Sequence, residues 1–165
     1  IAFFLETDVM SLYEELEVLS KRELESRVEI RLENYSNTKL IEMKVAIDMV
    51  RSIILPCILK QIVDYGSALD SCKLAGITSP TIVSQVKEIE VLYGHILERS
   101  TILQSFVGDC EKESGVFEKA EILATKGAGL LQSLRDVVDK VELLVSDENW
   151  SLPRYDDLLS SSALS

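Results

Sequence analysis

Apolar residues recur along this chain at alternating steps of three and four, the spacing that places them on one face of an α-helix. No stretch alternates apolar and polar residues as a half-buried strand does, and the three prolines are Pro56, Pro80 and Pro153. The pattern predicts an all-α protein, a bundle of long helices with coiled-coil-like packing.

A first helix is expected over residues 2–18. Ser20 and Glu23 then form the Ser-x-x-Glu capping box that satisfies free N–H groups at a helix start. From there a helical pattern runs toward Ala75. Its apolar stripe consists of Met43, Ile47, Val50, Ile54, Ile58, Ile62, Tyr65, Leu69 and Cys72.

Pro56 is expected to kink this long helix, because proline removes a hydrogen bond and clashes with the preceding turn. The Ser36-Asn37-Thr38 run is a second, weaker point where the helix could break.

A clear stop and restart follows at Gly76, Ser79 and Pro80, with glycine just past one helix and proline at the first position of the next. The second seam is Ile82, Val86, Ile89, Tyr93, Ile96, Leu103 and Val107, interrupted by Ser100. A third helix is expected to reach about Val145, with a seam of Leu130, Leu134, Val137, Val141 and Leu144. Gly127 and Gly129 leave its start undefined, because glycine disfavours a helix interior.

Composition and charge narrow the classes of function. The chain has 165 residues, 47% of them hydrophobic, which fits one folded domain. A formal charge of −11 disfavours nucleic acid and anionic membrane surfaces as partners. No apolar run reaches the roughly 18 residues that span a bilayer. Cys57, Cys72 and Cys110 are an odd number without metal-binding spacing, so the expected location is a reducing cytoplasm.

The sequence shows no set of residues with the types and spacing of a known catalytic site. His95 is the only histidine, so a metal-carboxylate bundle enzyme, which needs two, is nearly excluded. Glu25, Glu29 and Glu33 share a helix face but alternate with basic residues, as on a solvated helix. Gly127 to Gly129 lacks the Lys-Ser/Thr ending of a phosphate-binding loop. We therefore predict no catalytic, cofactor-binding or metal-binding residue in this chain, and a helical scaffold or interaction module.

Three stretches in order, "SKRELESRVEIRLENY" (20–35), "IDMVRSIILP" (47–56) and "LRDVVDKVELLVSDENWSLPRYDDLL" (134–159), resemble the C-terminal region of type III glutamine synthetases. The positions that carry the resemblance are Ser26, Arg27, Glu29, Ile30, Leu32, Glu33, Tyr35, Leu55, Pro56, Glu142, Val145, Asp147, Trp150, Leu152, Pro153 and Tyr155. Two positions depart from the family pattern: Ser151 replaces the usual first proline after the tryptophan, and Val28 replaces a common tyrosine.

The resemblance implies a complete enzyme that joins ammonia to glutamate with ATP and Mg²⁺, with its catalytic groups in a preceding β-rich domain. Residues 1–19 would be the remnant of that domain's last helix, 20–159 the helical C-terminal domain and 160–165 a flexible tail. The chain begins at Ile1 without Met, which also suggests a fragment. The implied partners are the upstream catalytic domain and other subunits of a homo-oligomer, and the implied role is structural support or subunit contact. The alternative is an independent all-α adaptor or coiled-coil interaction module.

The aromatic tail has two interpretations. Trp150, Leu152 and Tyr155 can fold back on the helices as a C-terminal aromatic clasp, with Pro153 fixing the turn, because large aromatics bury the most area per residue. Alternatively they pack against parts of the protein outside this chain. We expect the clasp to be internal.

Overall fold

The computed structural model describes residues 7–154, and those residues contain helices and no strand. The prediction of an all-α fold is confirmed. The chain divides into two compact units, which we describe separately. Unit 1 is made by the described residues of Ile1–Val45 and Leu103–Leu131, and unit 2 by those of Ala46–Ile102 and Gln132–Ser165.

Helix α1 spans Thr7–Glu15 and ends three residues before the expected end at residue 18. It ends in a left-handed turn at Glu17, whose φ is 52°, and the Val18 amide donates to the Tyr13 carbonyl at 3.1 Å. This bond satisfies a carbonyl that the helix end leaves free. Residues 2–6 of the expected helix lie outside the described residues.

Helix α2 spans Lys21–Met49 and begins at the predicted capping box. The Ser20 amide donates to Glu23 Oε2 at 2.9 Å, and the Glu23 amide donates to Ser20 Oγ at 3.4 Å. The helix does not break at the weaker point, residues 36–38, since α2 runs through them without interruption. Ser36 is 2% exposed, so its small side chain fits the buried stripe.

The proline in the long helical stretch is preceded by a π-helical turn, η2 (Val50–Ile54), after which α3 covers Leu55–Leu74. The Leu55 amide donates to the Val50 carbonyl, five residues back, and Pro56 follows as the second residue of α3. In a π turn the N–H donates to the carbonyl five residues back instead of four, so the hydrogen-bond register shifts by one residue. Here the shift lies beside Pro56, which has no N–H to donate. The kink at Pro56 stays a prediction.

The stop and restart between α3 and α4 (Pro80–Lys112) is confirmed. Gly76 has a φ of 72°, and the Ile77 amide donates to the Cys72 carbonyl at 2.9 Å. This is the bond of a Schellman motif, which glycine permits because it has no Cβ to clash at positive φ.

The third long segment is built from three pieces. They are α5 (Val116–Ile122), the π-helical turn η3 (Leu123–Gly127) and α6 (Ala128–Glu142). The expected end near Val145 is three residues late, since the chain turns after Glu142. A Cβ added at Gly127 would lie 2.6 Å from Met43 Cε and 3.0 Å from the Phe106 ring. The glycine therefore allows close helix packing in unit 1.

Unit 1 is held together by apolar contacts between α2 and the start of α5. Val28 and Leu32 of α2 pack with Ala120 of α5, and Tyr35 and Val116 cover this cluster. On the surface, Lys44 Nζ of α2 lies 2.5 Å from Glu111 Oε1 of α4. Exposed ion pairs contribute at most about 1 kcal/mol, so the apolar cluster dominates.

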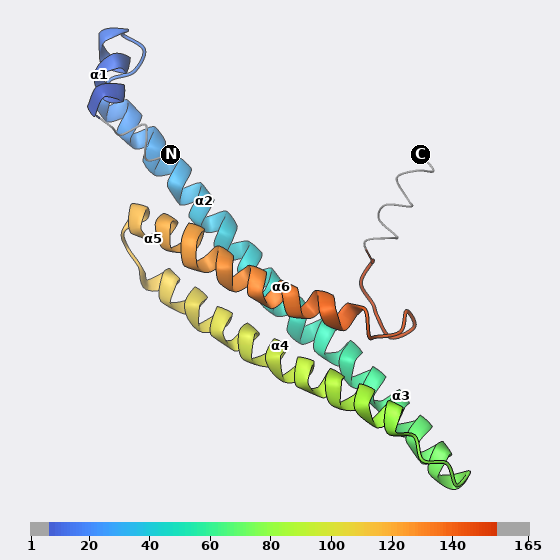
Figure 1. Cartoon of the computed structure of the whole chain (residues 1–165). Helices are drawn as coiled ribbons and strands as arrows, with labels where there is room; N and C mark the ends of the chain where they lie inside the picture. The colour runs from blue at the N-terminus through green and yellow to red at the C-terminus, as the bar shows by residue number, and fades with distance from the viewer. Residues whose placement is uncertain (1–6, 155–165) are drawn as a thin grey trace, which may run out of the picture. The chain divides into compact units, whose positions relative to one another are not determined.

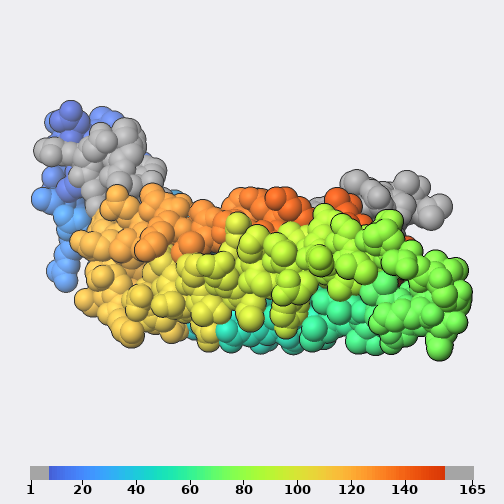
Figure 2. Space-filling view, turned by 60° about the horizontal axis from the view of Figure 1, so that its bottom comes forward, coloured from blue at the N-terminus to red at the C-terminus, as the bar shows by residue number. Residues whose placement is uncertain are grey.

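Unit 2 contains the end of α2, η2, all of α3, the first part of α4 and most of α6. In Figure 1, α3 is drawn in green and the end of α6 in orange-red. Ile58, Ile89, Ile96 and Val141 are at most 1% exposed. Arg99 of α4 donates to the Ser133 carbonyl of α6, which ties these two helices together. The hairpin that joins α3 to α4 forms the green surface at one end of Figure 2.

Candidate functional site

The turn that follows α6 is anchored to α3 by one buried glutamine. Gln61 is 6% exposed, and its Oε1 accepts hydrogen bonds from the Ser146 amide at 2.9 Å and from Asn149 Nδ2 at 3.1 Å. A buried carbonyl oxygen has two lone pairs, and both are used here. Gln61 thus fixes where the chain goes after α6.

Further polar contacts hold the same turn in place. Asn149 Nδ2 also donates to Asp64 Oδ2 at 2.6 Å, and Ser151 Oγ lies 3.5 Å from Cys57 Sγ. Arg154 Nη2 donates to the Val145 carbonyl at 2.7 Å and lies 2.9 Å from Asp147 Oδ1. The turn is therefore attached at several points, both to α3 and to itself.

The predicted clasp residues lie together in this turn. Trp150 is 8% exposed, Leu152 is half-buried and Pro153 is exposed. All three line a hollow of about 340 Å³, and its other lining residues are Met49, Ile54, Arg135, Val138, Asp139 and Glu142. Tyr155, the fourth member, lies outside the described residues. The burial of Trp150 supports an internal clasp, which stays a prediction.

The indole nitrogen of Trp150 has no acceptor among the described residues, although it is fully buried. Burying an unpaired donor costs about 1–3 kcal/mol, so apolar packing of the large ring must outweigh this cost. Trp150 therefore contributes to this turn by apolar packing of its ring and not by a hydrogen bond.

Sequence reasoning missed Gln61, because a polar residue in a helix is ordinarily assigned to the solvated face. One signal pointed to it. Position 61 follows Ile54 and Ile58 by seven and three residues, so it falls on the buried stripe of the long helix. A glutamine on such a stripe needs a buried hydrogen-bond partner.

The other residues considered as candidates for chemistry do not come together in one site. His95 and the glutamates at 25, 29 and 33 are exposed, as expected for a solvated surface. No group of three or more metal-ligating side chains exists within residues 7–154. Cys57, Cys72 and Cys110 are free thiols, and burial raises the pKa of Cys110, which keeps it protonated.

Charged side chains of the described part interact at the surface. The hydrogen bonds from Ser20 lower the pKa of Glu23, and the Lys44 ammonium lowers the pKa of Glu111. The Glu42 carboxylate raises the pKa of Lys39. Each shift arises from a surface pair rather than from a shared pocket: Glu23 caps the start of α2, Lys44 and Glu111 join α2 to α4, and Lys39 and Glu42 pair within α2.

Comparison with known proteins shows what the chain is similar to. Residues 1–73 match the family described as "Glutamine synthetase C-terminal domain". The chain is 27% identical over 152 residues to a glutamine synthetase of Bacteroides fragilis (strain YCH46), covering 86% of this chain and 20% of that protein. It is 24% identical over 157 residues to the type-3 glutamine synthetase of Dictyostelium discoideum, covering 91% and 21%. The chain thus spans about a fifth of the length of these relatives.

The resemblance to the C-terminal region of type III glutamine synthetases is therefore confirmed. Among the described residues, no helix is both long enough and apolar enough to cross a membrane.

Proposed function

Starting from this similarity to the C-terminal region of glutamine synthetases, we propose that the chain is a non-catalytic helical domain that supports the oligomer of such an enzyme. The observation that carries the proposal is the position of the match: the family is described as a C-terminal domain, and the relatives are about five times longer than this chain. The complete enzyme would join ammonia to glutamate with ATP and Mg²⁺, as part of nitrogen metabolism in the cytoplasm.

The distribution of polar side chains favours this structural role. The buried polar side chains of unit 2 are used in packing, as with Gln61, which holds the turn after α6. The carboxylates at 25, 29 and 33 are exposed along one helix face instead of converging on a pocket. Phosphoryl transfer needs charged groups preorganised around the transferring phosphoryl, an arrangement that such a helix face does not provide.

The expected partners are an upstream catalytic domain and other subunits of a homo-oligomer. Exposed apolar side chains are compatible with such contacts: Ile30, Ile41 and Val45 are each more than half exposed. An independent all-α adaptor remains the alternative function. The residues encoded before Ile1 distinguish the two, because a synthetase domain upstream supports the proposal and an unrelated domain contradicts it.

The role itself is tested in the longer protein that carries this chain. A variant lacking residues 20–159 should assemble less tightly than the intact enzyme, as measured by analytical ultracentrifugation. Its glutamine synthesis per subunit should fall at low protein concentration and recover at high concentration, because subunit association follows mass action. Unchanged assembly contradicts the proposal, and so does a loss of activity that is independent of concentration.

A further inference from the structure

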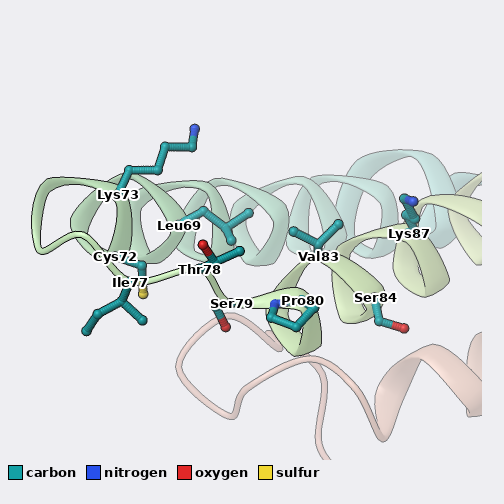
Figure 3. A pocket seen from close by; sticks show the side chains of 10 residues that line it. All are labelled: Leu69, Cys72, Lys73, Ile77, Thr78, Ser79, Pro80, Val83, Ser84 and Lys87. Carbon is teal, nitrogen blue, oxygen red and sulfur yellow. The ribbon is translucent and has the colours of Figure 1, made fainter.

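Two adjoining hollows lie along α4 in unit 2. The first, about 510 Å³, sits at the hairpin between α3 and α4, and Figure 3 shows side chains from both helices around it. The second, about 680 Å³, lies between α4 and the end of α6. Ser84 and Lys87 line both hollows, so the two adjoin, and together they are called here the α4 groove.

The α4 groove has an exposed apolar surface. Val83 is 39% exposed, Val91 51% and Leu143 81%, and all three line it. Contiguous exposed apolar side chains bordered by polar ones are typical of a protein contact site. The groove therefore has the composition of a docking surface.

The charge of the α4 groove is opposite to that of the chain. The chain carries a formal charge of −11, yet the charged lining residues are Lys73, Lys87, Lys140 and the single acid Glu88. Lys73 is paired with Asp70 at 3.0 Å, outside the lining. Lys87 and Lys140 have no ion pair within the described part of the chain. The groove thus favours an acidic, amphipathic partner.

Helix α1 and the turn after it have this chemistry. Asp8, Glu14, Glu15 and Glu17 are acidic, and no lysine or arginine precedes Lys21. Leu12 is 53% exposed and Leu16 63%, and the Leu16 amide donates to the Leu12 carbonyl at 3.1 Å, which stacks the two leucines one turn apart. The segment presents two exposed leucines and four carboxylates.

We infer that the α4 groove binds the α1 segment of a second copy of this chain. Leu12 and Leu16 enter the apolar part near Val91 and Leu143, and the glutamates at 14, 15 and 17 meet Lys87 and Lys140. The donor and acceptor surfaces differ, so the contact is heterologous and joins copies head to tail. The inference deepens the proposed role in subunit contacts and rests on it.

The test uses the 165-residue chain and two kinds of variant. Lys87→Glu/Val91→Asp disables the groove, and Leu12→Asp/Leu16→Asp disables the α1 segment. The matched control is Lys60→Glu/Val63→Asp, which makes the same chemical changes on exposed residues of α3 that line neither hollow. Circular dichroism confirms that each variant stays helical, and sedimentation equilibrium measures association.

The wild type and the control should associate with rising concentration, less so at high salt, whereas each disabled variant should associate at least about tenfold more weakly. An equimolar mixture of the two disabled variants should give a 1:1 heterodimer, because one intact α1 segment and one intact groove remain between them. This mixture distinguishes a second copy from docking within one chain.

A monomeric wild type at all concentrations overturns the inference, whether the groove is empty or filled by its own α1 segment. Equal association of the control and the groove variant overturns it as well, as does a mixture that stays monomeric. The proposed function is judged separately by deletion of residues 20–159 in the longer protein. If that deletion weakens assembly while Lys87→Glu/Val91→Asp does not, only the α1 contact is wrong.

Discussion

Trp150 is the residue on which the predicted internal clasp depends most. It is 8% exposed and lies in a turn attached to α3. We expect Trp150→Ala to lower the free energy of unfolding by about 3–5 kcal/mol, the usual cost of truncating a buried large aromatic. Chemical denaturation measures this, with Phe117→Ala as control because Phe117 is 41% exposed. Equal, small effects for both variants would argue against an internal clasp.

Two glycines in one helical segment are expected to respond differently to alanine. Space around Gly129 is open to 4 Å, so Gly129→Ala should stabilise the chain by about 1 kcal/mol through helix propensity. Gly127→Ala should lack this gain, because its Cβ would collide with Met43 and press on Phe106. Thermal melts of the two variants measure this difference. Equal increases in melting temperature would contradict the close packing at Gly127.

The capping box predicts a pH dependence at Glu23. Hydrogen bonds from Ser20 lower the pKa of Glu23 in the folded state. A carboxylate with a lowered folded pKa contributes stability above its unfolded pKa, and this contribution is lost as the pH falls through the folded pKa. Glu23→Gln should therefore have a lower melting temperature than the wild type at neutral pH. This difference should shrink as the pH falls, because Glu23 of the wild type becomes protonated. If the difference in melting temperature stays constant from neutral to acidic pH, ionised Glu23 does not stabilise the start of the helix.

At the scale of elements, periodicity predicted the type of each helix better than its ends. The capping box at Ser20 and the stop at Gly76 are local motifs, and both lie where the sequence placed them. The π turns η2 and η3 were not predicted, because the apolar period of the sequence does not report a one-residue shift in hydrogen-bond register. The continuity of α2 through Ser36 was also missed, because helix propensity alone does not report the packing of the apolar stripe around this buried serine.

The turn after α6 should depend on Gln61 as an element. Gln61→Leu removes the acceptor of the Ser146 amide and of Asn149, so amide exchange at Ser146 should accelerate. The free energy of unfolding should fall by about 0.5–1.5 kcal/mol, the usual net contribution of a hydrogen bond, because Asn149 keeps Asp64 as an acceptor. The same substitution at exposed Gln85 is the control. Unchanged exchange at Ser146 in Gln61→Leu would show that other contacts hold the turn.

At the scale of the whole molecule, the all-α class followed from periodicity, whereas the relation to glutamine synthetases rested on an ordered set of short stretches. The groove on α4 could not be predicted, because its lining residues come from three helices and are separated by up to 75 positions, from Leu69 to Leu144. Only the fold brings Lys87 and Lys140 to the same surface.

The central claim is that this region supports a synthetase without itself binding the substrates. Isothermal titration calorimetry of the 165-residue chain with Mg-ATP and glutamate tests it most directly. We expect no saturable binding tighter than about 1 mM, which corresponds to a free energy of about −4 kcal/mol. A micromolar isotherm that is abolished by Glu29→Gln or Glu33→Gln would instead show that the region is a ligand site.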